Sequence, residues 1–305
     1  MNKIAITTGD PNGIGAEITI KALNELNLPK DKILIISNSK VLDYYGNLKL
    51  DYEVVEIPYD TENIKPGQIT QEAGEFSFQS LKKVCEIKPQ AIVTAPVAKN
   101  ALHLANHHFN GQTEILQKYL AHNNQLAEML FVAGNFRVLL LTRHCALKEI
   151  SLTKEIVIEK IRNLSETFKT NFGILHPKFA LCGFNPHSGE EGILGREEID
   201  ILIPAVKALQ AEEINITMPL PADTLFVKAA KHYLNNEIDD YDCYIANYHD
   251  QGLIPIKTVA GDKTVNTTIG LDILRTSPGH GTAFDIAGKN IADPTSMIEA
   301  IKSVL

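Results

Sequence analysis

Three histidines follow short apolar runs of the sequence. His144 comes shortly after FRVLLLT, His187 after KFALCG, and His249 after DCYIA. Neutral imidazoles are the commonest protein ligands of zinc-like divalent ions, and three of them around an open position are typical of a catalytic metal site. A lone histidine after a strand is more often a hydrogen-bonded structural residue. The prediction of a metal site therefore depends on these three side chains meeting at one point.

Cationic and polar residues of the C-terminal third could bind an anion. Lys257 and Arg275 suit phosphate or carboxylate if they reach the same cleft, and Asn266 lies between them in the sequence. Either cation alone would usually be a solvated surface residue. Asp223, in LPADTLF, has two interpretations. We favour an N-cap of the following apolar helix, with a carboxylate near the metal as the alternative.

The segment GDPNGIGAE near the N-terminus also lies between a strand pattern and a helix pattern. Gly13 and Gly15 leave backbone N–H groups that could bind an anion at the start of a helix. The segment is not a dinucleotide fingerprint, because Ile18 stands in place of the third glycine, and it lacks the GK[ST] of a P-loop. We favour a loop that faces the ligand cleft, and the alternative is a tight turn capped by Asp10.

All of these residues follow predicted strands of one type. The strand patterns are β-branched and apolar throughout, as in a sheet that is buried on both faces, and they alternate with amphipathic helices. This alternation predicts an α/β fold with a mainly parallel sheet, in which ligands bind at the carboxyl ends of the strands. The predicted strands are 4–8, 33–37, 91–95, 136–142, 178–183 and 242–246, and the predicted helices are 16–26, 73–87, 113–122, 154–168 and 197–210.

The composition limits the kind of protein. A chain of 305 residues can form one large α/β domain or two lobes, and its formal net charge of -8 without a block of Lys or Arg argues against nucleic acid. No apolar run approaches a membrane span and the N-terminus does not read as a signal peptide, so we expect a cytoplasmic protein with no membrane partner. The four cysteines show no C-x-x-C spacing, and we expect small apolar residues in or beside strands.

Several longer motifs together resemble one family. They include TTGDPNGIGAEI, TAPVAKN, GQTE, NPHSGEEG, PLPADTLF, YHDQGLIPIK and VNTTIGLDILRTSPGHGTAFDIAG, and they extend along nearly the whole chain. In combination they resemble the 4-hydroxythreonine-4-phosphate dehydrogenase family of the vitamin B6 pathway. The closing stretch HGTAFDIAGKNIADP is also similar to the cofactor-binding segment of isocitrate and isopropylmalate dehydrogenases.

This resemblance implies an isocitrate/isopropylmalate dehydrogenase-like fold, with two α/β/α lobes, and a homodimer. The cofactor-side lobe would comprise residues 1–127 plus 260–305, and the metal-ligand and dimerisation lobe residues 128–259. NAD, or alternatively NADP, would bind without a Rossmann fingerprint. The implied cofactor contacts are His280, Gly281, Thr282 and Asp293.

The resemblance also implies roles for individual residues. The metal ligands fall on His144, His187 and His249. Zinc is the expected ion, with cobalt, nickel or iron as alternatives, whereas magnesium prefers oxygen ligands. The expected catalytic residues are Asp223 and Lys257. The implied substrate contacts are Gln112, Thr113, Lys257, Asn266 and Arg275.

One departure from the family bears on the substrate. The family usually has His where this chain has Gln112, and an amide cannot carry a proton. We expect NAD-dependent oxidation and decarboxylation of 4-phosphohydroxy-L-threonine to 3-amino-2-oxopropyl phosphate, in pyridoxine 5'-phosphate biosynthesis. A close alternative is the same chemistry on threonate or erythronate 4-phosphate. Further alternatives are a non-redox metal enzyme such as a phosphohydrolase or aldolase, and a non-catalytic ligand-binding protein.

Overall fold

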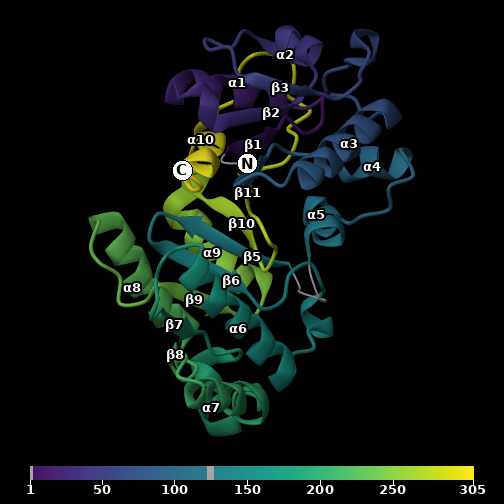
Figure 1. Ribbon diagram of the computed structural model, residues 1–305. Coiled ribbons are helices and arrows are strands. Elements are labelled where there is room, and N and C mark those ends of the chain that lie inside the picture. The colour runs from purple at the N-terminus through teal and green to yellow at the C-terminus, as the bar shows by residue number, and fades with distance from the viewer. Residues whose placement is uncertain (1–2, 122–126) are drawn as a thin grey trace. The chain divides into compact units, whose positions relative to one another are not determined.

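The computed structural model describes residues 3–121 and 127–305, and the chain divides into two compact units. Unit 1 comprises Met1–Ala127 and Val265–Leu305, and unit 2 comprises Glu128–Thr264. Both units combine a sheet with helices (Figure 1). Within the described residues, no helix is long and apolar enough to cross a membrane.

Unit 1 is built on a mainly parallel sheet. The strand order within the unit is β3-β2-β1-β4-β11-β10, and only the pair β10–β11 is antiparallel among its described pairings. The strands are β1 (Ile4–Thr7), β2 (Ile33–Ser37), β3 (Glu53–Glu56), β4 (Ala91–Thr94), β10 (Val265–Ile269) and β11 (Leu274–Pro278). The helices are α1 (Gly15–Leu26), α2 (Ser39–Tyr45), α3 (Gln71–Ile87), α4 (Lys99–Leu104), α5 (Gln112–Leu120) and α10 (Thr295–Lys302).

Helices cover both faces of this sheet (Figure 1). On one face Ile4 and Ile6 of β1 pack with residues of α1 and α10. On the other face Ala5, between them, packs with residues of α3 and α5. Successive side chains of a strand point to opposite faces, so burial of both sets requires the near-continuous apolar strands that the sequence shows.

The strands of unit 2 pair in a mixed arrangement. Its strand order is β5-β6-β9-β7-β8, with β5–β6 antiparallel and the other described pairings parallel. The strands are β5 (Glu128–Ala133), β6 (Phe136–Leu140), β7 (Lys178–Leu181), β8 (Asn215–Ile216) and β9 (Cys243–Ala246). The helices are α6 (Lys154–Thr170), a π-helical turn (Glu198–Leu202) that leads into α7 (Ile203–Ala211), α8 (Ala222–Asn235) and α9 (His249–Ala260).

The core of unit 2 is aromatic on the face that α8 and α9 cover. The ring of Tyr244 on β9 lies 5.7 Å from that of Phe136 on β6 and 5.7 Å from that of Phe226 on α8. On α9, Leu253 and Ile256 belong to the same cluster. This packing fixes α9 against the two central strands, and therefore fixes the direction of its first residue, His249.

Candidate active site

Two of the three predicted metal ligands lie together in unit 2. Strands β6 and β9 are parallel neighbours, so their carboxyl ends meet, and His144 and His249 follow these ends. Their ring centroids are 5.5 Å apart and the ring planes are inclined by 49°. Both residues line one cavity of about 410 Å³, together with Arg143, Cys145 and Asp250 among others. His249 is the first residue of α9.

A carboxylate orients each of two predicted ligands. His249 Nδ1 lies 2.7 Å from Asp250 Oδ1, and His187 Nδ1 lies 2.6 Å from Glu190 Oε1. A carboxylate accepts a hydrogen bond, so the proton of each neutral imidazole sits on Nδ1 and the lone pair on Nε2. This is the usual support of a metal-binding imidazole. The two carboxylates were missed from the sequence, although Asp250 is adjacent to its histidine and Glu190 follows three residues later.

His187 lies on an unusual loop after β7. The residues from His187 to Glu191 all have positive φ, between 41° and 83°, in the left-handed region. Such a run is costly for residues other than glycine, and strain of this kind is concentrated at functional sites. The hydrogen bond to Glu190 raises the pKa of His187, and the nearby charge of Asp223 adds to this.

Among residues 3–121 and 127–305, no group of three His, Cys, Asp or Glu side chains is close enough to share one ion. Convergence of His144, His187 and His249 on a metal therefore stays a prediction. What the structure does bring together is the pair His144 and His249. The donor set fits a zinc-like ion, because it consists of imidazoles supported by carboxylates.

Asp223 is not the N-cap that its sequence position favoured. Helix α8 has Pro221 at its N-cap and no side-chain cap hydrogen bond, and Asp223 lies exposed in the first turn. A carboxylate there is favourable to the helix dipole without capping it. The alternative interpretation, a carboxylate beside the predicted metal ligands, stays a prediction. Lys257 lies exposed in the last turn of α9, the helix that His249 begins.

Unit 1 holds the predicted anion contact Arg275 inside the sheet. Its side chain is 3% exposed and donates to two threonine hydroxyls. Nε and Nη2 lie 2.9 Å and 2.6 Å from Thr94 Oγ1, and Nη1 lies 3.1 Å from Thr268 Oγ1. Burial lowers the pKa of Arg275 to about 10. Because its hydrogen-bond partners here are neutral, an anionic ligand would complement this guanidinium.

Two carboxamides near these strands carry unused acceptors. Gln112, the first residue of α5, donates from Nε2 to the backbone carbonyl of Ala95 at 3.0 Å. Its Oε1, and likewise Oδ1 of Asn266 on β10, is buried without a hydrogen-bond partner in the part of the chain that the structure describes. Buried polar atoms are normally paired, so both sites fit a bound polar ligand. Thr113, half-buried, follows Gln112 in α5.

The predicted cofactor contacts belong to the irregular segment before α10 in unit 1. His280 and Gly281 are exposed, and His280 Nδ1 lies 3.0 Å from the carbonyl oxygen of Gly281. Thr282 contributes its carbonyl oxygen to a hydrogen bond from Ile14 N at 3.1 Å. Asp293 accepts from Thr295 N at 2.7 Å, and hydrogen bonds from the side chain and the backbone of Thr295 lower its pKa. His280, Gly281 and Asp293 are thus accessible to a dinucleotide, while a hydrogen bond from Ile14 fixes the backbone at Thr282.

The loop of GDPNGIGAE is buried, and Asp10 does not cap α1. Asp10 Oδ1 accepts from Asn12 N at 2.9 Å, which closes a turn ahead of the helix, and the N-cap of α1 is Ile14 without a side-chain cap bond. Burial raises the pKa of Asp10 to about 6, against weaker opposing contributions from the backbone N–H groups of Asn12 and Ala98. The turn interpretation therefore describes the local structure better than an open anion cradle.

The cysteines follow the sequence expectation in three positions. Cys85, Cys182 and Cys243 are buried, and burial raises the pKa of each thiol. Cys145 is different, because it is exposed beside His144.

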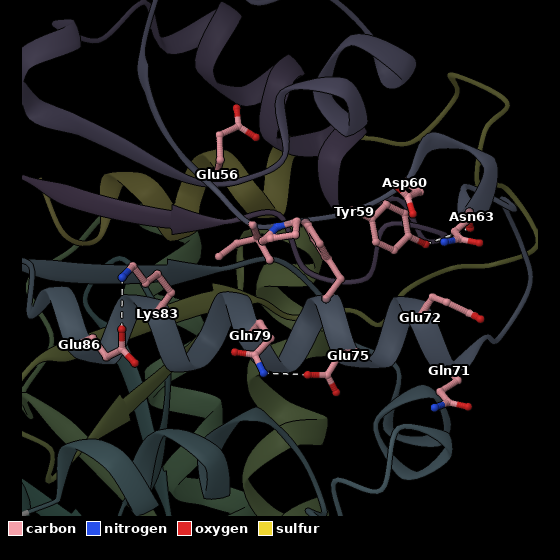
Figure 2. Close-up of a pocket in the computed structure, with 13 residues that line it drawn as sticks. Glu56, Tyr59, Asp60, Asn63, Gln71, Glu72, Glu75, Gln79, Lys83 and Glu86 are labelled. Carbon is pink, nitrogen blue, oxygen red and sulfur yellow. Dashed lines mark hydrogen bonds and ion pairs between the residues drawn. The ribbon is translucent and has the colours of Figure 1, made fainter.

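A larger cavity of unit 1, about 790 Å³, contains none of the predicted site residues. Figure 2 shows that most of its polar side chains project from α3 and from the segment after β3. The cavity has an acidic lining, which suits neither phosphate nor a dinucleotide. Its charged residues are Glu56, Asp60, Glu72, Lys83, Glu75 and Glu86.

Comparison with known proteins identifies relatives over the whole chain. A 4-hydroxythreonine-4-phosphate dehydrogenase of Sulfurihydrogenibium sp. is 39% identical over 325 residues, which cover 99% of this chain and 97% of the relative. A protein of Oceanobacillus iheyensis, provisionally named D-threonate 4-phosphate dehydrogenase, is 36% identical over 330 residues, with coverage of 99% and 96%.

Solved structures agree with these relatives. The crystal structure of a 4-hydroxythreonine-4-phosphate dehydrogenase from Klebsiella pneumoniae superposes with a TM-score of 0.86 at 32% identity, covering 100% of this chain and 98% of that one. Isocitrate dehydrogenase from Methylococcus capsulatus matches with a TM-score of 0.50 at 14% identity, covering 100% and 85%, which supports the predicted fold. The family model described as pyridoxal phosphate biosynthetic protein PdxA matches residues 6–304. The chain therefore belongs to the PdxA family.

Proposed function

We propose that the chain is an NAD-dependent, divalent-metal-dependent dehydrogenase that oxidises and decarboxylates 4-phosphohydroxy-L-threonine to 3-amino-2-oxopropyl phosphate. The observation that carries the proposal is similarity along nearly the whole chain to proteins named as this dehydrogenase. These names give no support to the phosphohydrolase, aldolase and ligand-binding alternatives. The histidine pair of unit 2 and the buried guanidinium of unit 1 are the features expected of such an enzyme.

The residues of unit 2 would hold the metal and handle the proton. His144, His187 and His249 would be the ligands, with Asp250 and Glu190 fixing two of the rings. When bound, the metal would lower the pKa of the substrate hydroxyl and polarise the resulting ketone, while NAD would accept the hydride. Asp223, in the first turn of α8, would take the hydroxyl proton or orient a ligand.

The residues of unit 1 would bind the anionic groups of the substrate. Arg275 is held by Thr94 and Thr268 in one orientation, so it loses little side-chain freedom when an anion arrives. Gln112 and Asn266 would use their unpaired oxygens toward the ligand. In unit 2, Lys257 would supply a further cation.

Metal analysis combined with an NADH assay tests this proposal. The purified protein should contain a divalent metal and form NADH with 4-phosphohydroxythreonine. His144→Ala and His249→Ala should lose both metal and activity, whereas His176→Ala, at an exposed loop position of unit 2, should retain both. Full metal content and full activity in the first two variants would contradict the assignment. Asp223→Ala should keep its metal and lose activity, and normal turnover would exclude its role.

D-threonate 4-phosphate is the second candidate substrate. The relative from Oceanobacillus iheyensis carries that name at 36% identity, and Gln112 departs from the histidine that the family usually has. The two substrates share the phosphate, carboxylate and C3 hydroxyl, and differ at C2, which bears an amino group or a hydroxyl. NADH formation with each substrate, measured side by side under the same conditions, would decide between them.

We also propose that the protein acts as a cytoplasmic homodimer. The proposal rests on the family resemblance that the sequence motifs show. Light scattering on the purified chain should give twice the mass of 33.7 kDa, and a monomeric mass at assay concentrations would contradict it.

A further inference from the structure

We infer that Glu17 and Lys21 of α1 are positioning residues for NAD binding, because they hold the backbone of the predicted cofactor segment at residues 290–292. This inference rests on the proposed function, in which His280, Gly281, Thr282 and Asp293 contact NAD. Neither Glu17 nor Lys21 forms a described hydrogen bond to the side chain of a predicted cofactor contact or of a predicted metal ligand.

Lys21 uses all three of its ammonium donors in one place. Its Nζ lies 2.8 Å from Glu17 Oε1, 2.9 Å from the carbonyl oxygen of Ala292 and 3.1 Å from that of Asn290. An ammonium group has three N–H bonds, so this residue is fully committed to the segment. A lysine that served only solubility would leave its donors in water.

Glu17 binds both Lys21 and the backbone of the same segment. The residue is 1% exposed, and its Oε1 also accepts from the backbone N–H of Ala292 at 2.8 Å. Ala292 therefore has both its N–H and its C=O bound to the same pair of side chains. Pairing with a cation stabilises a buried carboxylate, and Lys21 supplies that cation to Oε1, whereas Oε2 has no hydrogen-bond partner among the described residues. Hydrogen bonds from Thr295 do most to lower the pKa of Asp293, the next residue, and the charge of Lys21 adds a smaller contribution.

The start of α1 holds the other end of the segment. Ile14 N donates to the carbonyl oxygen of Thr282 at 3.1 Å, and a Cβ built on Gly13 would lie 3.0 Å from the same oxygen. Between these ends the segment contains neither helix nor strand, and Ala283 and Asn290 have positive φ. An irregular loop fixed at two points by one helix can present its side chains in a defined geometry. The turn GDPNGIGAE would therefore help to hold the predicted cofactor segment, a role that anion binding by its backbone does not explain.

Calorimetric titration of NAD into variants of the full chain tests the inference. Lys21→Met should weaken NAD binding about tenfold, while the KM of the phosphorylated substrate changes less than about twofold. Gly13→Ala, which presses on the Thr282 end, should act in the same direction. Lys21→Arg, which keeps the charge and several donors, should restore most of the affinity. Lys83→Met, at an exposed ion pair with Glu86 on α3, is the control and should bind NAD normally.

The possible results separate this inference from the proposed function. NAD affinity unchanged in Lys21→Met would overturn the positioning role. Equal losses of NAD and substrate affinity with a lower melting temperature would also overturn it, because they indicate a general structural role. Wild-type protein that binds no NAD would instead refute the proposed function, and this inference with it.

Discussion

Replacing Asp10 by Asn should stabilise the protein at neutral pH and destabilise it slightly in acid. The carboxyl group of Asp10 is fully buried, and Oδ2 has no hydrogen-bond partner within the described residues. Burial raises its pKa from 3.8 to about 6. Because the folded pKa exceeds the unfolded one, this group stabilises the fold fully only below about pH 3.8, and that contribution is lost as the pH rises through about 6.

The size of the effect follows from the two pKa values. A difference of about 2 units corresponds to about 3 kcal/mol at neutral pH, at 1.36 kcal/mol per unit. Asparagine keeps the oxygen that accepts from Asn12 N, but its new NH2 group meets no described acceptor, which offsets the gain by about 1 kcal/mol. Asp10→Asn should therefore gain about 2 kcal/mol near pH 7.5 and lose about 1 kcal/mol near pH 4.

Urea unfolding followed by far-UV circular dichroism would measure this, since the chain has no Trp for fluorescence. Asp43→Asn, at an exposed position of α2, is the matched control and should change the unfolding free energy by less than about 0.5 kcal/mol at either pH. A variant at position 10 that is destabilised at both pH values by the same amount would refute the reasoning, because the carboxyl would then be ionised without cost in the fold.

Three further outcomes are expected. Gly252→Ala should reduce metal affinity about tenfold. The new Cβ would lie 2.6–2.9 Å from three side-chain atoms of the strands that α9 covers, and the resulting shift of α9 would displace His249. Unchanged metal affinity in a competition titration would contradict this. Glu128→Gln should lower the unfolding free energy by about 3 kcal/mol by leaving Lys160 without its buried partner, and adding Lys160→Met should recover most of the loss in urea titrations. Treatment with a chelator should abolish NADH formation with little change in the circular dichroism spectrum, and added zinc or cobalt should restore NADH formation. Full activity after verified removal of the metal would exclude the metal's role.

The strands that sequence patterns predicted are largely buried on both faces. Ile33–Ser37 and Ala91–Thr94 are examples, because the strands of a parallel sheet covered by helices are rich in apolar side chains. Strand β10, VNTTI, was missed because its buried side chains include Thr267 and Thr268. Thr268 is buried beside Arg275, which donates a hydrogen bond to its hydroxyl. This contact joins two strands of a hairpin, so the sequence of β10 alone does not predict it.

The sequence suggested residues for the candidate site but not the structure around them. Histidines at strand ends are recognisable from the sequence, whereas the left-handed loop that carries His187 has no local signal apart from its glycines. The burial of Arg275 could not be predicted either, because a cation in a polar segment normally lies at the surface. Sequence patterns thus proposed the chemical groups, and tertiary packing determines how each side chain is held.

The position of β11 in unit 1 has a consequence for synthesis of the protein on the ribosome. This strand pairs with β4 through Leu274 and Ala91, and therefore joins chain segments that lie 183 positions apart in the sequence. Until it emerges, the nascent chain carries β4 with one open hydrogen-bonding edge, a known starting point for aggregation. Unit 2, made from one continuous segment, is complete before that strand exists. Chaperones that shield open strand edges should therefore matter most during translation of the last third of the message.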